Sequence, residues 1–284
     1  MQYDTKHQVA LITGANSGIG LELTRKLLHE GWQVVALNRS EVPSGDRLLQ
    51  QAVNQGQLRI YKVADLADYN SLRRTLQKVR ESEPFIDVIF NNAGQSFPEL
   101  TYTPQGRETH YELLTIVPYL ITMELKELLL KGQLKTVINT SSSALNMLKT
   151  FEFEQLEHPL KFRKMLGPYA ASKLALSLWT EALAPSLAKE GILIRSVDPG
   201  NNNTVRKGQK SGLPIWLEPL MRFTPPPTHG AGLLFDSALG EHRSKSDVFI
   251  IKGKIQSLPF RTLAKPVLER VEQIYREEFR KVDI

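Results

Sequence analysis

Short runs of Val, Ile and Leu recur along the 284-residue chain, each separated from the next by a longer stretch with helical periodicity. This alternation is typical of βαβ units, in which crossover helices join parallel strands and cover both faces of the sheet. We therefore predict a doubly wound α/β fold with a parallel sheet of about seven strands. The predicted strands are 9–13, 34–37, 58–63, 87–90, 136–140, 192–197 and 248–251, and the predicted helices are 18–30, 46–55, 69–82, 106–131, 168–190 and 229–239.

The composition narrows the kinds of protein that this chain can be. It contains no cysteine, which excludes disulfides and thiolate nucleophiles, and no pair of histidines or carboxylates has metal-ligand spacing. The net charge of +6 comes from scattered basic residues, which favours a solvated basic surface over a nucleic-acid interface. No apolar run approaches the ~20 residues of a membrane helix. We therefore expect one soluble, cytoplasmic domain over residues 1–284, without a metal.

A glycine-rich turn follows the first predicted strand. The segment "TGANSGIG" places Gly14, Gly18 and Gly20 directly before a helical stretch. Glycines let the backbone approach a pyrophosphate, and the start of a helix offers free N–H groups and a positive dipole end. The turn favours a dinucleotide site of the Rossmann type. A plain tight turn is the alternative interpretation of this segment by itself.

The end of the second predicted strand bears on the choice of cofactor. A protein that prefers NAD usually has Asp or Glu there to bind the ribose 2′-hydroxyl. Here the strand ends in Asn38 and Arg39, so a 2′-phosphate would meet a guanidinium fork. The sequence therefore favours NADP(H) over NAD(H), and a surface arginine in a loop is the alternative.

Further segments after the predicted strands make the pattern specific. They are "VADLAD" at 63–68, "NNAG" at 91–94, "NTSSSA" at 139–144 and "VDPG" at 197–200, and the helix between the last two begins with "YAASK" at 169–173. Because these segments occur in this order, the chain resembles the short-chain dehydrogenase/reductase family from about residue 7 to 255. Within it, the chain is similar to the compact single-domain branch of retinol-dehydrogenase-like and carbonyl-reductase-like enzymes.

The resemblance implies a cofactor site along these strand ends. Arg39 would take the 2′-phosphate, and Asp65 with Leu66 would hold the adenine. The other residues implied to contact the cofactor are Gly14, Asn16, Ser17, Ile19 and Gly20 at the phosphates, Asn92, Ala93, Gly94, Tyr169 and Lys173 around the ribose, and Pro199, Gly200 and Thr204 at the nicotinamide.

Tyr169 and Lys173 stand four residues apart in a predicted helix, which places both on one face. That spacing also fits an ordinary helix surface, and the resemblance favours a catalytic pair. Reduction of a carbonyl by hydride needs a proton for the developing alkoxide, and a phenol can donate it. A free tyrosine has a pKa of ~10, which a cation about 4 Å away lowers by about three units before desolvation opposes it. We interpret Tyr169 as the general acid and base, assisted by Lys173.

The resemblance also implies a serine that hydrogen-bonds the substrate oxygen. The segment "NTSSSA" offers Ser141, Ser142 and Ser143, and the family's pattern of Asn, any residue, Ser, Ser points to Ser142. Residues 144–166 are expected to form a flap beside the substrate, and we interpret His158 within that flap as structural.

One position departs from the family pattern. Where related enzymes have a catalytic Asn and then a Gly three residues later, this chain has Leu114 and Val117. In those enzymes the main-chain carbonyl at the Asn position holds a water that reaches the lysine. Pro118 has no N–H to donate to Leu114 O, four residues back. Our hypothesis is that Pro118 keeps this relay open, and a harmless kink is the equal alternative.

Three functions remain for the whole chain. The first is an NADP(H)-dependent oxidoreductase for a hydrophobic aldehyde, ketone or alcohol, and the second is a catalytically weak NADP(H)-binding sensor or scaffold. A sugar-nucleotide epimerase or dehydratase is disfavoured, because the sheet leaves no large C-terminal substrate domain.

We expect a lid at 201–228, with Trp216, Leu217, Leu220, Met221 and Phe223, and an amphipathic C-terminal helix at 264–281. The resemblance implies a homodimer or homotetramer through the helices at 106–131 and 168–190.

Overall fold

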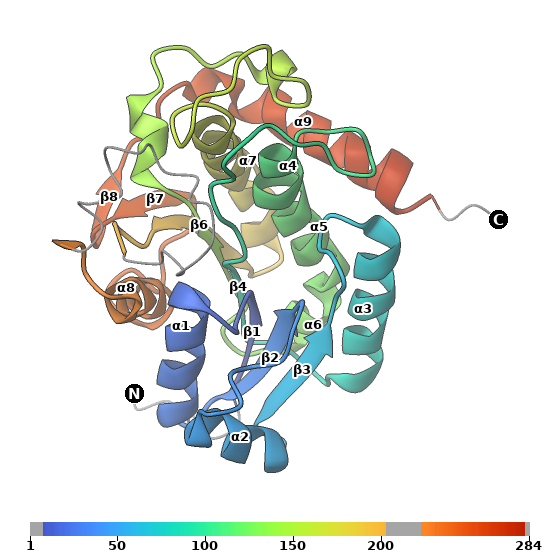
Figure 1. The fold of residues 1–284 in the computed structure, drawn as a ribbon, viewed down its shortest axis with the longest axis vertical. Helices are drawn as coiled ribbons and strands as arrows, with labels where there is room; N and C mark the ends of the chain where they lie inside the picture. The colour runs from blue at the N-terminus through green and yellow to red at the C-terminus, as the bar shows by residue number, and fades with distance from the viewer. Residues whose placement is uncertain (1–7, 203–222, 282–284) are drawn as a thin grey trace.

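The computed structural model describes residues 8–202 and 223–281, which contain one eight-stranded sheet with helices on both faces (Figure 1). The strands are β1 (Val9–Thr13), β2 (Gln33–Asn38), β3 (Leu58–Lys62), β4 (Val88–Asn91), β5 (Thr136–Thr140), β6 (Leu193–Asp198), β7 (Val248–Ile251) and β8 (Lys254–Gln256). Their order is β3-β2-β1-β4-β5-β6-β7-β8; β1 to β7 run parallel, and β8 runs antiparallel to β7. The predicted doubly wound α/β fold is therefore confirmed.

The strand β8 is absent from the sequence prediction. It follows β7 after a turn at Lys252 and Gly253, whose φ angles of 48° and 74° are both positive. Two positive φ angles are typical of the type I′ turn that closes a two-residue hairpin. All three residues of β8 are exposed, so the strand lacks the apolar alternation by which a half-buried strand is recognised.

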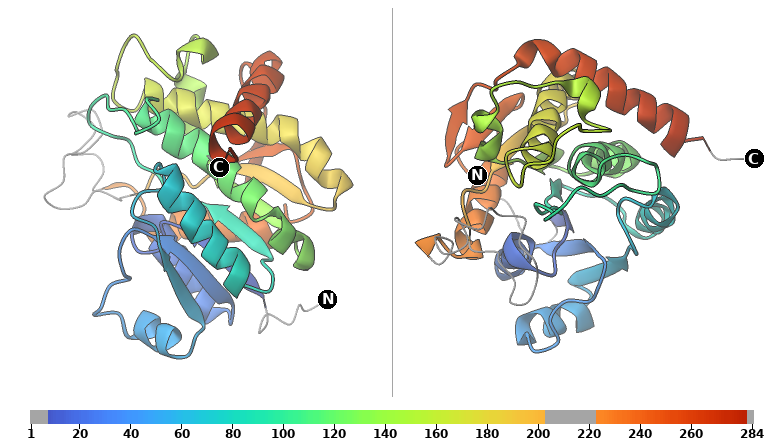
Figure 2. Two further views of the ribbon diagram at one scale, coloured as in Figure 1. Left: turned by 90° about the vertical axis from the view of Figure 1, so that its right-hand side faces the viewer. Right: turned by 45° about the horizontal axis from the view of Figure 1, so that its top comes forward.

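Two layers of helices cover the sheet, one on each face (Figures 1 and 2). The helices are α1 (Gly18–His29), α2 (Arg47–Asn54), α3 (Tyr69–Ser82), α4 (Thr109–Tyr111), α5 (Val117–Glu124), α6 (Lys126–Lys131), α7 (Pro168–Lys189), α8 (Pro227–Leu239) and α9 (Ala264–Ile274). Successive strand residues face opposite layers. On β1, Leu11 joins the core formed with α3, α5, α7 and α9, whereas Ile12 joins the core formed with α1, α2 and α8.

The helix predicted at 106–131 is present from Thr109 to Lys131, but it is not one regular α-helix. Between α4 and α5 the chain widens into a π-helical turn at Glu112–Ile116, and α6 follows α5 as a separate helix. In the π turn, Val117 N–H donates to Glu112 O, five residues back. Pro118 comes next and has no N–H to donate to Leu114 O. The proline therefore stands at the distortion, as the hypothesis about Pro118 requires.

Neighbouring side chains hold the π turn in place. The indole N–H of Trp179, in α7, donates to Thr115 O (3.1 Å), and Thr115 Oγ1 donates to Ser172 O, also in α7 (2.8 Å). The buried carboxylate of Glu112 accepts a hydrogen bond from Arg107 Nε (2.7 Å). The π turn is thus tied to the helix that carries Tyr169 and Lys173.

The C-terminal helix lies on the helices through which we expect an oligomer. The stretch expected at 264–281 consists of α9 and a π-helical turn at Tyr275–Phe279. The ring of Tyr275 packs edge-on against Tyr119 of α5 (5.8 Å between centroids), which packs against Trp179 of α7 (5.4 Å). Figure 2 shows α9 against α7. An oligomer through α5 and α7 stays a prediction, and α9 would have to take part in its contact.

Much of the expected lid lies outside the described residues. This applies to Trp216, Leu217, Leu220 and Met221, and also to the expected nicotinamide contact Thr204. Of the five apolar lid residues, Phe223 is described, and its side chain is 74% exposed. None of the helices within residues 8–202 and 223–281 is both long enough and apolar enough to cross a membrane.

Replacing Pro118 tests the relay hypothesis. In Pro118→Ala the new N–H at position 118 can donate to Leu114 O, so turnover should fall about tenfold, less than the about 100-fold that losing a proton-transfer group costs. Leu114→Asn should change turnover only modestly. Pro185→Ala is the matched control, because Pro185 also lies inside a helix but on an exposed part of α7. Unchanged turnover in Pro118→Ala, measured as the rate of NADPH consumption, would refute the hypothesis.

Candidate active site

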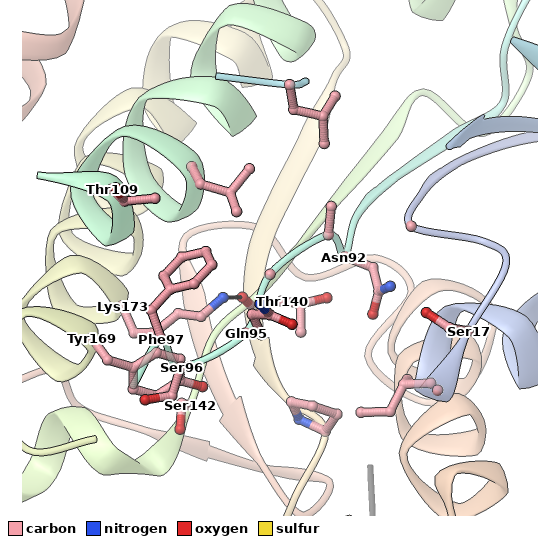
Figure 3. Close-up of a pocket in the computed structure, with 18 of the residues that line it drawn as sticks. Ser17, Asn92, Gln95, Ser96, Phe97, Thr109, Thr140, Ser142, Tyr169 and Lys173 are labelled. Carbon is pink, nitrogen blue, oxygen red and sulfur yellow. Dashed lines mark hydrogen bonds between the residues drawn. The ribbon is translucent and has the colours of Figure 1, made fainter. Parts of the chain in front are cut away.

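A cavity of about 1190 Å³ opens at the carboxyl ends of the parallel strands, where ligands bind in doubly wound sheets. Of the predicted site residues, its wall contains Gly14, Asn16, Ser17, Ile19, Arg39, Asp65, Leu66, Asn92, Ala93, Gly94, Ser142, Tyr169, Lys173, Pro199 and Gly200. Figure 3 shows Ser17 and Asn92 on one side, and Ser142, Tyr169 and Lys173 on the other. The structure thus brings together residues that lie far apart in the sequence.

Among the predicted site residues that the structure describes, Gly20 is the one that does not line this cavity. A Cβ atom there would lie 2.2 Å from Gly14 O and 2.6 Å from Asn92 Nδ2, so only glycine lets α1 pack against the turn. Gly14 itself has a φ of 69° and Gly18 one of 54°, conformations that favour glycine. The turn leads directly into the N-terminus of α1. This cradle fits the phosphates of a dinucleotide.

The first two positions at the end of β2 are Asn38 and Arg39, neither of which is acidic, and Glu41, which also lines the cavity, is paired with Lys62 (2.5 Å). The Oδ1 atom of Asn38 accepts a hydrogen bond from Ala15 N (2.7 Å) and so supports the glycine-rich turn. Arg39 is exposed at the wall, beside Asn16, whose Nδ2 donates to Ser40 Oγ (2.8 Å). These side chains form a polar and cationic corner, and they fit an anionic group on the ribose.

Ser142, Tyr169 and Lys173 gather where β5 meets the first two turns of α7 (Figure 3). Ser142 hydrogen-bonds to the Tyr169 side chain. The ammonium of Lys173 donates to Thr140 O (2.6 Å), the last residue of β5. Tyr169 is half-buried at the cavity wall, and the protein around it raises the pKa of the phenol, although the bond to Ser142 opposes this rise. The expectation that Lys173 lowers the pKa of Tyr169 is therefore wrong for this structure, in which burial and the charge of Asp198 raise it.

The three adjacent serines have different surroundings. Ser141 is buried, and its Oγ lies 2.7 Å from Ser177 Oγ inside the protein. Ser143 hydrogen-bonds to the carboxylate of Asp198, which favours the ionised form of that carboxylate. Of the three, Ser142 is the one that bonds to Tyr169, which supports its choice from the sequence.

Leu114 explains part of the burial around Lys173. A Cβ atom placed on Gly94 would lie 2.3 Å from Leu114 Cδ2 and 3.8 Å from Lys173 Nζ, so the leucine fills the space beside the lysine. Lys173 is only 5% exposed. Burial lowers its pKa to about 7, and the negative charge of Asp198 opposes this shift. The departure from the family pattern therefore places an apolar side chain where relatives have a polar one.

Asp198 is a site residue that the sequence analysis missed. It ends β6 at the cavity wall, is 3% exposed, and accepts a hydrogen bond from Gly200 N (3.0 Å) at Oδ1. Its Oδ2 has no hydrogen-bond partner among residues 8–202 and 223–281. Burial raises the pKa of Asp198, and its charge raises the pKa values of Tyr169 and Lys173. A carboxylate directly after the predicted strand 192–197, in "VDPG", was the available signal.

The side chains of Ser142, Tyr169 and Lys173 can together transfer a proton to or from the oxygen of a bound molecule. A phenol with a serine hydroxyl beside it can donate a proton to an oxygen placed between them, and a nearby ammonium favours the tyrosinate that remains. The phosphate cradle lies in the same cavity. A dinucleotide and a small oxygen-containing molecule can therefore meet there.

Comparisons with known proteins agree with this geometry. The family model described as short chain dehydrogenase matches residues 8–152. The chain is 31% identical to retinol dehydrogenase 11 of Mus musculus over 238 residues, which cover 82% of this chain and 74% of that protein. It is 30% identical to the WW domain-containing oxidoreductase of Drosophila melanogaster over 207 residues, which cover 70% of this chain but only 50% of the fly protein.

The fold also matches solved structures. L-sorbose reductase from Gluconobacter frateurii, complexed with NADPH and L-sorbose, aligns with a TM-score of 0.64 and 20% identity. The alignment covers 88% of this chain and 97% of the reductase. At this identity the likeness concerns the fold.

Replacing Asp198 should shift the pH dependence of turnover. The Asp198 charge raises the pKa of Tyr169, so Asp198→Asn should lower it. Reduction needs the protonated phenol and is lost as the pH rises through that pKa. The alkaline limb of the kcat/KM profile should therefore move to lower pH. Glu154→Gln, which removes an exposed negative charge outside the cavity wall, should leave the limb in place. A limb that stays or moves upward in Asp198→Asn would contradict this assignment.

Proposed function

Because the chain belongs to the short chain dehydrogenase family, we propose that it is an NADP(H)-dependent oxidoreductase that transfers hydride between the nicotinamide and a hydrophobic aldehyde or ketone, or the corresponding alcohol. The convergence of Ser142, Tyr169 and Lys173 on the cavity that contains the phosphate cradle carries this proposal. Retinol dehydrogenase 11, to which the chain is similar, is a dehydrogenase by name.

The chain's own residues supply the proton chemistry. When bound, the nicotinamide supplies the carbon that gives or takes hydride. Ser142 holds the substrate oxygen beside Tyr169, whose phenol gives its proton to the developing alkoxide in reduction and takes it back in oxidation. The ammonium of Lys173 stabilises the tyrosinate between these steps.

The preference for NADP(H) rests on the corner at the end of β2. Asn38 stands where an NAD-binding protein usually has a carboxylate, and Arg39 stands beside it at an exposed position on the cavity wall. A guanidinium can bind the 2′-phosphate through two parallel hydrogen bonds. Asn16 and Ser40 add neutral donors at the same place.

The preference for a hydrophobic substrate rests on the cavity wall near Tyr169. Phe97, Leu113, Met147 and Met165 line the cavity, and they come from the loop after β4, the π turn and the segment before α7. Apolar walls around a few placed polar groups are typical of sites for apolar small molecules. The polar groups here are those of Ser142 and Tyr169, which would orient the carbonyl.

A second candidate is a catalytically weak NADP(H)-binding sensor. It is motivated by Leu114, which buries Lys173 where related enzymes have a polar side chain. On this reading the cavity binds NADPH tightly and turns over no carbonyl. The two functions are separated by measuring binding and turnover on the same preparation.

Replacing Tyr169 tests the oxidoreductase proposal. With a panel of aliphatic and aromatic aldehydes, ketones and quinones, Tyr169→Phe should consume NADPH at least about 100-fold more slowly than the wild type, because the proton donor is gone. Fluorescence titration should show that NADPH still binds to the variant. Turnover that survives in Tyr169→Phe would exclude the phenol as the donor, and binding without turnover in the wild type would favour the sensor.

Replacing Arg39 tests the choice of cofactor. Hydrogen bonds to charged groups contribute about 1.5–3 kcal/mol, so Arg39→Ala should weaken NADPH binding by roughly tenfold to a hundredfold and leave NADH binding nearly unchanged. Arg47→Ala is the control, because Arg47 is exposed on α2 outside the cavity wall. Equal losses for the two cofactors would refute recognition of the 2′-phosphate by Arg39.

A further inference from the structure

The loop that follows β4 forms one wall of the cavity and is folded back on the start of α4. Its outer end is tied by two main-chain bonds, from Thr109 N to Thr101 O (3.0 Å) and from Thr103 N to Arg107 O (2.9 Å). Its inner end, nearer the catalytic tyrosine, is tied by Phe97 N–H, which donates to Nε2 of His110 (2.8 Å). His110 is therefore the anchor of the part of the loop that faces Tyr169.

The protonation of His110 follows from its two partners. A main-chain N–H can only donate, so Nε2 must be the unprotonated acceptor. The proton then sits on Nδ1, which lies 2.6 Å from Glu108 Oε1 and donates to it. Glu108 is fully buried, and its Oε2 accepts a hydrogen bond from Tyr111 N (2.9 Å). The carboxylate thus fixes both the tautomer of the imidazole and the direction in which Nε2 points.

The ring of His110 also lies against three aromatic side chains, Phe97, Tyr169 and, at 6.4 Å between centroids, Phe162. Its centroid is 4.9 Å from that of Phe97 and 6.0 Å from that of Tyr169, both in edge-to-face arrangements. His110 is 1% exposed and is not part of the cavity wall, whereas Phe97 and Tyr169 are. Figure 3 shows Phe97, Tyr169 and Lys173 on the same side of the cavity. His110 therefore contacts residues of the cavity wall without lining the cavity itself.

We propose that His110 is a positioning residue that sets the aromatic wall of the substrate pocket. By holding Phe97 N–H at the acceptor that Glu108 fixes, it keeps Phe97 in the wall of the cavity that Tyr169 also lines. The pocket then selects carbonyl compounds that carry a flat apolar group next to the carbonyl, such as an aromatic ring or a conjugated chain, because such a group packs on the Phe97 ring. This inference rests on the proposed function, which it narrows to a substrate class.

The hydrogen bonding of His110 can be separated from the packing of its ring by matched variants. His110→Phe keeps a ring of similar size between Phe97 and Tyr169 but removes both nitrogens. His110→Gln keeps an amide oxygen that can accept from Phe97 N–H and an amide N–H that can donate to Glu108. Phe97→Ala removes the aromatic wall and leaves the main-chain bond to His110.

The experiment measures two quantities on these variants and the wild type, after thermal melting has identified the folded ones. The first is hydrogen exchange of the Phe97 amide, which needs no substrate. The second is the ratio of kcat/KM for cinnamaldehyde to kcat/KM for propanal, with saturating NADPH. We expect His110→Phe to raise the exchange rate and to lower the ratio, each about tenfold, the effect of one lost hydrogen bond. We expect His110→Gln to restore most of both.

A double-variant cycle completes the test. If His110 acts through the Phe97 ring, then His110→Phe should lower the ratio far less in a Phe97→Ala background than in the wild type. Unchanged exchange at Phe97 in His110→Phe, or an equal loss for both aldehydes, would overturn the inference. If His110→Phe does not fold, failure of His110→Gln to keep the wild-type ratio would overturn it. A wild type that turns over neither aldehyde but reduces other carbonyl compounds of the panel would overturn the substrate class, and one that reduces no member of the panel would contradict the proposed function. Exchange at Phe97 decides in either case whether His110 anchors the loop.

Discussion

Parallel pairing in the middle of the sheet is the constraint on which the site depends. Ile12 of β1 lies beside Phe90 of β4, and Thr140 of β5 lies beside Val197 of β6, so these strands end at one edge. The glycine-rich turn, the three serines and Asp198 therefore leave the sheet as neighbours. A shift of one residue in β5 would reverse the faces of its side chains and displace the serines that follow. The Thr140 carbonyl that receives Lys173 is part of the same register.

Burial and charge act against each other in this site. Desolvation disfavours the ammonium of Lys173, the carboxylate of Asp198 and a tyrosinate at Tyr169 alike. Asp198 favours the ammonium but disfavours the tyrosinate, since like charges repel. Lys173 therefore has a pKa of about 7, near neutrality, where modest changes in its surroundings alter its charge. Perturbed titratable groups that meet in a cavity are typical of catalytic sites.

The sequence predicts the parallel sheet and the strand ends because both leave local signals. Buried strands appear as apolar runs, and glycine or polar residues follow them. The π turn leaves no such signal: the apolar periodicity of 106–131 continues through it, and what stabilises it are contacts such as that of Trp179 with Thr115, 64 residues away. Pro118 predicts that the helix is distorted, but it does not predict a π-helical turn.

Residues that act from outside the cavity wall are the hardest to predict. His110 is one of these residues, because nothing in its neighbours along the sequence shows that its Nε2 meets Phe97 N–H. Asp198 was visible in "VDPG", but its effect depends on the burial that the folded chain imposes. Ser142 could be selected among three serines only through the family pattern, and its different surroundings appear once β5 and α7 pack together.

The transfer of deuterium from C4-labelled NADPH to a carbonyl substrate tests the central claim most directly. After incubation of the protein with labelled NADPH and a mixture of hydrophobic aldehydes and ketones, mass spectrometry of the products locates the label. The account predicts an alcohol with one deuterium at the former carbonyl carbon for each NADPH consumed. Saturable NADPH binding with no deuterium in any product would contradict it.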